Sequence, residues 1–530
     1  MGSVAKARVE SHKEVIGKKV THVEYRGNHA QIAERDTFGE EMCFVYKCGM
    51  RDTNGNPPSL QFCKISVPRN YREARTSDQW SYWEHAMNEE KDSLDTHDTM
   101  EYVERPWGKK VIPVHWIYSV KVDEFGNVTR FKARLVAQGC RQIPGIDVDE
   151  VFAPTSSFGA RRALLSVAAA KDYEIHQVDI KTAFLNGDLE EEVYVTQPPG
   201  FENGDSRIVC RLNKALYGLK QSPRAWHKKL DMEMTKLGFE ACKSDAGVYV
   251  RKQDGDPPLY VLVYVDDLLI ICPEMNLVEW FKQLLRDRFN IHDLGEVKDF
   301  LGCQVRRNRE NHQLSISCIP KIDALVEKFG VSSGRVVDTP MQKDFCPTQL
   351  PSIGEGREAV GAGSPLEPGH RYCELVGSLL YIANTTRPDV AQSVGVLSRY
   401  RCNPTTAHWN AVVRVLGYLR DTRDKVLVLG SNPEVELEGY VDADFAGDLD
   451  QRFSTSGFVF FVYGGAVAWS SKKQKSVATS TVEAEFMASS TAIKEAAWLK
   501  SFLEELGCAP RSVKLYCDNQ GCIQNLKNPV

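Results

Sequence analysis

The sequence predicts a multidomain α+β fold, and three observations lead to this prediction. The chain has 530 residues, a length that corresponds to three or four domains of about 150 residues rather than to one core. Runs rich in Val, Ile and Leu at residues 111–121, 128–137 and 261–271 have the length and composition of strands. Stretches rich in Ala and Leu at residues 161–171 and 480–506 are typical of helices.

Composition and targeting signals narrow the class of protein. Hydrophobic residues make up 42% and charged residues 26% of the chain, as in ordinary soluble globular proteins. No apolar run reaches the roughly 18 residues of a membrane helix, and the N-terminal sequence lacks the apolar core of a signal peptide. The 15 cysteines include no C-x-x-C pair, which argues against a zinc site and a disulfide framework. We therefore expect an intracellular, cytoplasmic protein with reduced thiols, neither secreted nor membrane-bound.

Charge is unevenly distributed along the chain, although the net charge is only −5. Residues 105–141 contain eight Lys and Arg against Asp123 and Glu124, a local charge of +6. Residues 207–229 contain seven Lys and Arg and no acid, a local charge of +7. A groove for a polyanion would carry this charge. A solvated helix face would carry it too, and for either stretch alone that is the favoured interpretation.

Residues 1–75 form a segment of unknown role, which we expect to be a small unit or partly disordered. Residues 44–46 have the composition of a strand, and residues 52–58 are rich in turn-forming Asn, Gly and Pro. The pattern becomes helical at residues 78–94, where four large apolar side chains recur near 3.6 spacing. They are Trp80, Trp83, Met87 and Leu94.

A basic β-hairpin follows. The strands at residues 111–121 and 128–137 are joined by turn residues 123–127. Arg130, Lys132 and Arg134 alternate along the second strand and therefore lie on one face. Because three cations on one face repel one another, a triphosphate or a nucleic-acid backbone is the simplest compensation.

Three aspartates form the strongest candidate site. Asp266 and Asp267 lie between two apolar runs, and a two-residue link of this kind predicts a tight hairpin with both carboxylates at its tip. A solvated tip and a divalent-metal site explain these two residues about equally well. Asp179, near the end of a strand predicted at residues 173–180, supplies the third carboxylate that a metal site needs. A lone aspartate at a strand end is usually a cap or turn residue, so its weight comes from the other two.

Six motifs occur in order along the chain: RFKARLVAQG (130–139), FAP (152–154), HQVDIKTAFLNG (176–187), LYGLKQSPRAW (216–226), YVDD (264–267) and FLG (300–302). In this order and at this spacing they make residues 78–305 resemble the reverse transcriptase of copia-type LTR retrotransposons. The resemblance implies a right-hand polymerase, with fingers and palm at residues 76–305. A thumb or connection is expected at residues 306–430, with a linker near residues 340–370 and helices at residues 372–384, 389–400 and 405–420.

The resemblance implies a role for each matching residue. Asp179, Asp266 and Asp267 would be the catalytic carboxylates and metal ligands. Asp179 and Asp266 would bridge two Mg²⁺ ions, or Mn²⁺ in their place, with Asp267 more peripheral. The dNTP-binding residues would be Lys132, Arg134, Phe184, Tyr217, Gly218 and Lys220. The primer grip would be Phe300, Leu301 and Gly302. Phe184 would exclude a ribose 2′-OH; without the resemblance it is an ordinary core aromatic.

A second enzyme domain is predicted at residues 434–530. Strands are expected at residues 438–447, 457–463, 465–470 and 512–519, with a long helix at residues 480–506. This order resembles the ribonuclease H domain of the same elements, and the resemblance implies catalytic roles for Asp442, Glu485 and Asp518.

Each of these three acids has an alternative. Glu483 competes with Glu485, but the spacing from Ser480 to Glu483 fits a capping box, which gives Glu483 a structural role. Asp444 competes with Asp442 with less support. Asp518 alone also fits a helix N-cap.

The ribonuclease H family continues into a further helix with a fourth acidic residue, whereas this chain stops at Val530. We therefore expect a C-terminally truncated domain with weak or no activity, in a fragment of the usual polyprotein. The leading prediction is an RNA-directed DNA polymerase of the cytosol or a virus-like particle, whose partners are an RNA template, a DNA primer, an RNA–DNA hybrid and dNTPs. The alternative is a degenerate, catalytically silent remnant that only binds nucleic acid. A palm-fold nucleotide cyclase is disfavoured by the basic hairpin and the second domain.

Overall fold

The computed structural model describes most of the chain from residue 61 onward. The described ranges are residues 61–122, 128–253, 255–331, 334–343, 345, 364–367, 369–432, 437–448 and 450–527. Four short strands precede them: β1 (Glu24–Arg26), β2 (His29–Gln31), β3 (Ala33–Arg35) and β4 (Glu41–Tyr46). The strand predicted at residues 44–46 lies within β4. The turns predicted at residues 52–58 and 123–127, and most of the predicted linker, lie outside the described residues.

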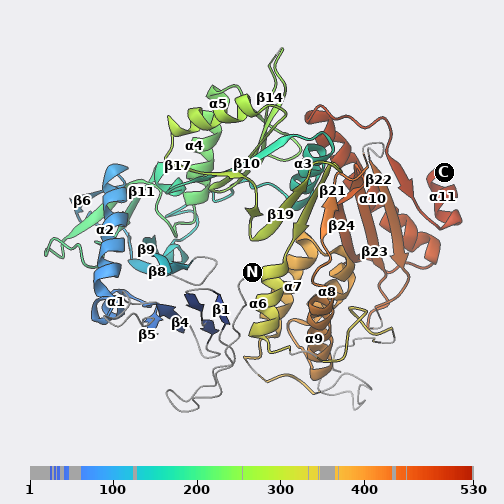
Figure 1. Cartoon of the computed structure of the whole chain (residues 1–530), viewed down its shortest axis with the longest axis horizontal. Helices are drawn as coiled ribbons and strands as arrows, with labels where there is room; N and C mark the ends of the chain where they lie inside the picture. The colour runs from blue at the N-terminus through green and yellow to red at the C-terminus, as the bar shows by residue number, and fades with distance from the viewer. Residues whose placement is uncertain are drawn as a thin grey trace. The chain divides into compact units, whose positions relative to one another are not determined.

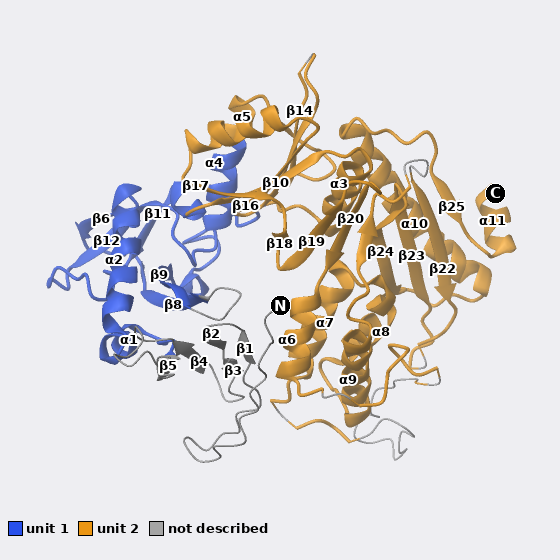
Figure 2. Ribbon diagram, viewed as in Figure 1, with its two compact units in different colours: residues 1–153, 182–232 blue, residues 154–181, 233–530 orange. Residues whose placement is uncertain are grey.

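The chain forms two compact units, and the fold is mixed α/β. Unit 1 comprises residues 1–153 and 182–232, and unit 2 comprises residues 154–181 and 233–530 (Figure 2). The chain therefore crosses from one unit to the other three times. The predicted domains at residues 76–305, 306–430 and 434–530 were assigned by function and not by compactness, and they stay a prediction.

Unit 1 combines a small sheet, a hairpin and a helix that is buried on one face (Figure 1). Its sheet has the order β6 (Met100–Glu104), β12 (Ile208–Lys214), β11 (Asp188–Val195), β7 (Val111–Ile112). The predicted basic hairpin is confirmed as β8 (Val114–Val122) and β9 (Val128–Ala137). The remaining elements are β5 (Gln61–Ser66), α1 (Tyr71–Thr76), α2 (Trp80–Thr96), η1 (Gly139–Arg141), η2 (Ala183–Asn186) and the first residues of α4 (Ser222–Lys236).

The core of unit 1 forms where α2 packs on β9. The apolar periodicity predicted this face correctly, because Trp83, Met87 and Leu94 are all buried. The Trp83 ring meets Tyr118 of β8 and Phe131 of β9 edge-on, with centroid distances of 5.3 and 4.7 Å. One side of the hairpin is therefore packed against α2, and this helix does not cover the other side.

Unit 2 is built on an antiparallel six-stranded sheet. Its order is β13 (Glu240–Ala241), β14 (Val248–Arg251), β15 (Leu259–Tyr264), β16 (Asp267–Cys272), β10 (Glu174–Ile180), β17 (Ile291–Glu296). The helix α3 (Phe158–Ala170), whose first turn is capped by the Ser157 hydroxyl, precedes β10, and α5 (Met275–Arg286) follows β16. Residues 268–272 of β16 are fully buried, as expected for a central strand with an apolar run.

A second antiparallel sheet and a group of helices follow in unit 2. The sheet has the order β18 (Asp299–Phe300), β19 (Cys303–Asn308), β20 (Gln313–Ser317), β21 (Leu427–Leu429). The helices are α6 (Ile319–Lys328), α7 (Tyr372–Thr385), η3 (Pro388–Val390), α8 (Ala391–Leu397), η4 (Ser398–Tyr400) and α9 (Thr406–Asp421). The three helices predicted between residues 372 and 420 are therefore confirmed, with a 3-10 turn at each end of the middle one.

The last sheet of unit 2 has the order β24 (Gly465–Lys473), β23 (Thr455–Val462), β22 (Glu438–Asp444), β25 (Lys514–Tyr516). β22 pairs antiparallel with β23 and parallel with β25. The long helix α10 (Thr481–Glu505) packs on β22 and β23, and α11 (Gln520–Lys527) follows β25 (Figure 1). Every element predicted from residue 438 onward is present.

One hydrophobic core joins the three sheets of unit 2. The helix α3 lies at this junction, where the buried Arg162 guanidinium donates to the carbonyl of Val467 on β24 at 2.7 Å. The same guanidinium lies over the Trp469 ring, 3.8 Å from its centroid. The Ser166 hydroxyl donates to the carbonyl of Val462 at 2.5 Å. The last sheet is therefore packed into unit 2 rather than tethered to it.

Among the described residues, no helix combines the length and the apolar character needed to cross a lipid bilayer.

Candidate functional site

The hairpin between β15 and β16 turns one residue earlier than predicted. Tyr264 pairs with Asp267, so the two-residue link is Val265–Asp266 and not Asp266–Asp267. Val265, rather than an aspartate, adopts the left-handed conformation that the turn requires, with φ of +59°. A β-branched residue is disfavoured there. The ladder decides the turn position, because Asp267 pairs with β15 on one side and with β10 on the other.

The strand register brings the three predicted polymerase carboxylates together. Asp179 of β10 is the direct neighbour of Asp267 on β16. The Ile180 N–H donates to the Asp266 carbonyl at 2.9 Å, which fixes the turn against the end of β10. All three aspartates are half-buried. Asp267, predicted to be the more peripheral ligand, is thus the acid opposite Asp179 in the ladder.

The carboxylates perturb one another. Burial raises the pKa of Asp267 above its usual range, and the charges of Asp266 and Asp179 raise it further. The Gln177 side-chain amide opposes this rise by donating to Asp267 Oδ1 at 3.2 Å. Gln177 lies two residues before Asp179 and hence on the same face of β10. The sequence analysis missed Gln177, although its two-residue spacing from Asp179 was a usable signal.

A buried lysine holds the strands behind the carboxylates. Lys282 of α5 is 2% exposed, and its ammonium lies 2.9 Å from His176 Nδ1 on β10 and 3.0 Å from Asp293 Oδ1 on β17. Burial, followed by the Lys282 charge, lowers the pKa of His176. The neutral imidazole can then accept from the ammonium. This contact fixes the orientation of β10 and with it Asp179.

The predicted primer-grip residues form a tight turn in unit 2. Phe300 pairs with Cys303, and the linking residues Leu301 and Gly302 have φ of +51° and +73°. The Phe300 side chain belongs to the core, whereas the Leu301 carbonyl accepts from the Tyr381 hydroxyl at 2.7 Å. Phe300 is therefore a core residue, and Leu301 and Gly302 form the turn.

In unit 1, three of the predicted dNTP-binding side chains form a stack. The Arg134 guanidinium lies 4.5 Å from the centroid of the Tyr217 ring. The Phe184 ring also packs against the Tyr217 ring in a tilted arrangement, with 5.0 Å between the two centroids. Phe184 is half-buried, and its role in excluding a ribose 2′-OH stays a prediction beside the alternative of an ordinary core aromatic.

Gly218 permits the close approach on which this stack depends. Its φ is +88°, and a Cβ there would lie 2.2 Å from the Ala137 carbonyl oxygen. The Ala137 N–H in turn donates to the Tyr217 carbonyl at 2.8 Å. Gly139 faces the same loop, because a Cβ on it would lie 2.1 Å from the Gly218 oxygen. Both glycines are therefore needed to join the end of β9 to the Tyr217 loop.

The two predicted lysines of this group differ in their surroundings. Burial lowers the pKa of Lys132, and the Arg134 charge adds to this effect. The Lys220 ammonium donates to the Gln142 carbonyl at 3.0 Å. Lys220 therefore joins the segment before α4 to the segment after η1. Part of the charge on β9 is compensated within unit 1, because Arg130 pairs with Glu89 of α2 at 2.7 Å.

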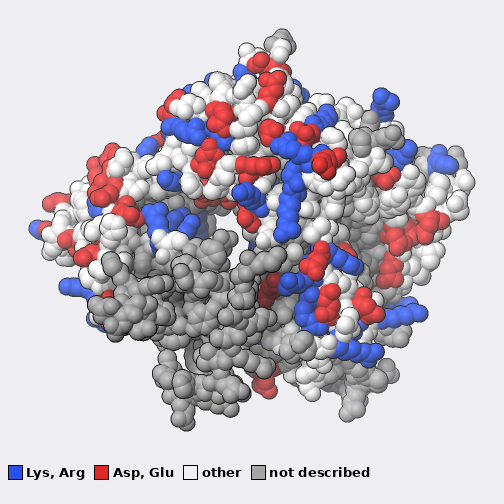
Figure 3. Space-filling view, viewed as in Figure 1, with Lys and Arg blue, Asp and Glu red and all other residues white. Residues whose placement is uncertain are grey.

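The two basic stretches are less positive in space than along the chain. Acids outside residues 207–229 pair with five of the seven cations there, and four of these acids come from distant segments: the five cations are Arg207, whose partner is the nearby Asp205, and Arg211, Lys214, Arg224 and Lys228. Across the face that Figure 3 draws, acidic and basic side chains are interspersed. A continuous cationic groove therefore does not follow from these stretches.

The three predicted ribonuclease H carboxylates also converge. Glu485 of α10 is 5% exposed, and its Oε1 accepts from the Ala443 N–H of β22 at 3.2 Å. Burial raises the pKa of Glu485, and the neighbouring Asp442 and Asp518 raise it further. Asp442 lines a hollow of about 510 Å³. These acids come from a strand, a helix and the loop after β25.

A cysteine joins this second group. Glu485, Cys517 and Asp518 each offer a ligand atom within 4.8 Å of the others, which no other such trio does among the described residues. The Cys517 Sγ lies 4.0 Å from Glu485 Oε2. The sequence analysis named Asp518 and missed Cys517, the residue directly before it.

Two of the alternatives can be judged from the helix ends: Glu483 has a structural role, and Asp518 is not a helix cap. The Ser480 hydroxyl accepts from the Glu483 N–H at 3.2 Å, as a helix cap should. The Glu483 carboxylate reaches back to the Thr479 N–H at 2.6 Å, one residue earlier than a capping box predicts. Asn519, not Asp518, caps α11 by accepting from the Cys522 N–H at 2.8 Å.

Comparisons with known proteins find similar sequences along most of this chain. Residues 97–343 match the protein-family model described as "Reverse transcriptase (RNA-dependent DNA polymerase)". The chain is 40% identical over 483 residues to the retrovirus-related Pol polyprotein from transposon TNT 1-94 of Nicotiana tabacum; the match covers 89% of this chain and 36% of that polyprotein. It is 36% identical over 468 residues to the corresponding polyprotein from transposon RE2 of Arabidopsis thaliana, covering 88% of this chain and 31% of the relative.

A third relative is covered completely. The chain is 34% identical over 322 residues to the transposon Ty5-1 protein of Saccharomyces cerevisiae, a match that covers 60% of this chain and 100% of the yeast protein. By contrast, the chain spans only about a third of the two plant polyproteins.

Proposed function

This chain belongs to the family of copia-type retrotransposon Pol proteins that contain a reverse transcriptase domain, and from this premise we propose that it is an RNA-directed DNA polymerase. The observation that carries the proposal is the register of unit 2. It pairs Asp179 with Asp267 and holds Asp266 at the adjoining turn. Nucleotidyl transfer needs closely spaced charge stabilisation and little covalent chemistry from the protein.

The carboxylates fit divalent metal ions, which reverse transcriptases generally use. The three side chains offer hard oxygen ligands of the kind that Mg²⁺ prefers. The raised pKa of Asp267 reflects burial and mutual repulsion, which a cation would relieve. Such ions would supply activation of a primer 3′-OH and charge stabilisation of the departing pyrophosphate. Asp179, Asp266 and Asp267 would be the residues that hold them, with Mn²⁺ able to replace Mg²⁺.

The residues of unit 1 and the β18–β19 turn would handle the substrates. Lys132 and Arg134 are proposed to bind the dNTP triphosphate, and the half-buried ring of Phe184 to discriminate against a ribose 2′-OH. Tyr217, Gly218 and Lys220 would support the nucleotide and the RNA template, and Phe300, Leu301 and Gly302 the DNA primer. The stack of Arg134 on Tyr217 supports this assignment, because it fixes the direction of a guanidinium that would otherwise be mobile.

The last sheet is proposed as a ribonuclease H-like domain with Asp442, Glu485 and Asp518 as its acids. Their convergence on the edge of α10 supports this proposal. Cleavage of an RNA–DNA hybrid that is lost in Asp442→Asn and Glu485→Gln would support this assignment, and cleavage that survives both substitutions would contradict it.

The test of the polymerase is primer extension on an RNA template with a DNA primer, dNTPs and Mg²⁺. Wild type should extend the primer, and Asp266→Asn should not. Asp424→Asn is the matched control, since the Asp424 side chain is 89% exposed and belongs to neither proposed site. A folded wild-type protein that fails to extend the primer would favour the alternative, a catalytically silent remnant that only binds nucleic acid. Extension that survives Asp266→Asn would refute the site assignment.

The proposed function also implies a place of action. A polymerase of this kind would work in the cytosol or in a cytoplasmic virus-like particle. Fractionation of expressing cells, with the chain followed by immunoblotting, tests this placement.

A further inference from the structure

The loop between β6 and β7 displays an unusual side chain. Trp107 is 100% exposed, more than any other large hydrophobic residue among those the structure describes. Large aromatic side chains are usually buried at least in part, and Trp is enriched at interfaces, where its apolar ring and its N–H both find partners. The neighbouring residues show whether this loop is built to present the ring.

The backbone of the loop holds Trp107 outward. The Lys109 N–H donates to the Pro106 carbonyl at 3.4 Å, and Gly108 has φ of +75°. Left-handed Gly at the third position is what a type II turn requires, and it places Trp107 at the second position. The Arg105 N–H donates to the Arg207 carbonyl at 2.8 Å, which ties the loop to the sheet of unit 1. The ring is therefore presented on an anchored turn.

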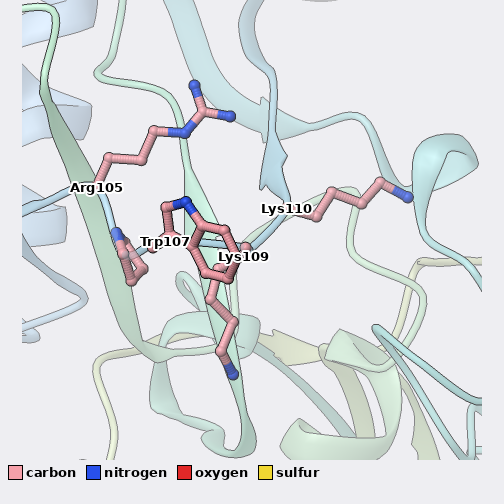
Figure 4. A pocket seen from close by; sticks show the side chains of 6 residues that line it. Arg105, Trp107, Lys109 and Lys110 are labelled. Carbon is pink, nitrogen blue, oxygen red and sulfur yellow. The ribbon is translucent and has the colours of Figure 1, made fainter.

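Cations surround the ring. Residues 105–110 line a hollow of about 440 Å³, and Figure 4 shows the Trp107 ring between the Arg105 and Lys109 side chains, with Lys110 pointing away. Lys109 is paired with Glu192 at 2.5 Å and Lys110 with Asp147 at 2.9 Å. In the described part of the chain no acidic group pairs with Arg105. The loop thus combines one open aromatic face with one uncompensated guanidinium.

We propose that Trp107 and Arg105 form a binding site for single-stranded nucleic acid, with one unpaired base stacked on the indole and a neighbouring phosphate on the guanidinium. An aromatic platform beside a cation is how proteins hold single strands without reading sequence, because every base has a π face. A duplex offers its phosphates but not its base faces. The site rests on the proposed function only in taking nucleic acid as the partner, and it is separate from every residue assigned to catalysis.

The test is binding of the full chain to fluorescein-labelled 12-mers, measured by anisotropy. Three strands are compared: oligo(dT), oligo(U) and an abasic strand of the same length. Trp107→Ala should weaken binding of both base-bearing strands about fivefold or more and leave the abasic strand unchanged. Trp107→Phe should retain most of the affinity. Arg105→Ala should weaken binding to all three strands and reduce the salt dependence of log K by about 0.7.

The chain contains its own matched control. Trp280 of α5 is 38% exposed, but its ring is covered by the Arg251 guanidinium at 4.7 Å from the centroid. Trp280→Ala should therefore bind like wild type. Equal binding by Trp107→Ala and wild type would overturn the proposal, as would an equal loss for the abasic strand or a comparable loss in Trp280→Ala. A preference for oligo(U) or oligo(dT) shows which nucleic acid the site takes.

The experiment separates this site from the polymerase. If primer extension is absent while the Trp107 effect is present, the proposed function fails and the site stands. If extension proceeds and Trp107→Ala binds all strands normally, the site fails and the polymerase stands.

Discussion

The two acidic clusters of unit 2 solve the same electrostatic problem in different ways. In each, burial and two neighbouring carboxylates raise the pKa of one acid, Asp267 in the first cluster and Glu485 in the second. The first cluster relieves that acid with a side-chain amide from Gln177, and the second with the backbone N–H of Ala443. The first cluster also carries backbone strain at Val265. The donor to Asp267 is thus a side chain that a substitution can remove, whereas the donor to Glu485 is a backbone group that most substitutions leave in place.

The largest expected effect separates the two clusters. Asp179→Asn should reduce primer extension by at least about 100-fold, the scale seen when one charge-stabilising group is removed. Glu485→Gln should leave extension within twofold of wild type. Single-turnover extension assays check both variants, and any hybrid cleavage should respond in the opposite order. If Glu485→Gln also abolished extension, the two clusters would not be independent sites.

The second effect concerns the replaceable amide. Gln177→Leu keeps the size of the side chain but leaves Asp267 without its donor, so the rate of extension should fall about tenfold, as expected for loss of a hydrogen bond to a charged group. Gln177→Glu should be worse, because it adds a fourth negative charge. Gln392→Leu on α8 is the matched control. Gln142→Leu is unsuitable, because Gln142 in unit 1 accepts hydrogen bonds from Lys220. Wild-type rates in Gln177→Leu would mean that the amide contact carries no weight.

The third effect is on stability and has the same sign in both clusters. A carboxyl whose folded-state pKa is raised lowers stability when ionised, and this cost disappears as the pH falls through the raised pKa. Asp267→Asn and Glu485→Gln should therefore raise the melting temperature of the metal-free protein at neutral pH. The gain should shrink as the pH falls toward the usual Asp and Glu range. Thermal denaturation in chelator from pH 7 to pH 4 measures it, and a gain that grows at low pH would reverse the assigned direction.

The smallest effect tests the strain, which only the hairpin cluster has. Asn tolerates the left-handed conformation far better than Val does, so Val265→Asn should raise the unfolding free energy of unit 2 by about 1 kcal/mol. Denaturant titration checks this value. Val263→Asn, at a buried ladder position of the same strand, should destabilise instead. A destabilised Val265→Asn would mean that contacts of the valine side chain outweigh the strain.

Sequence patterns predicted the helices and strands better than they predicted the contacts between them. The basic hairpin, the strand at residues 174–180 and the long helix α10 all follow from local periodicity, which depends only on neighbours along the chain. The hairpin link was wrong by one residue, because pairing of Asp267 with β10 decides the turn and residues 261–271 do not contain that information. The net positive charge around residues 207–229 was overestimated for a similar reason, since acids from distant segments pair with these cations.

The sequence by itself determined which acids this protein could use and the approximate position of the strand or helix in or beside which each lies. Only the tertiary structure decided which of them meet, because convergence depends on register and on packing between segments up to 90 residues apart, such as Gln177 and Asp267. It alone placed Cys517 beside Glu485 and exposed Trp107 on a fixed turn. Local composition sets the chemistry of a side chain, whereas its burial and its neighbours, which set its charge, are properties of the folded chain.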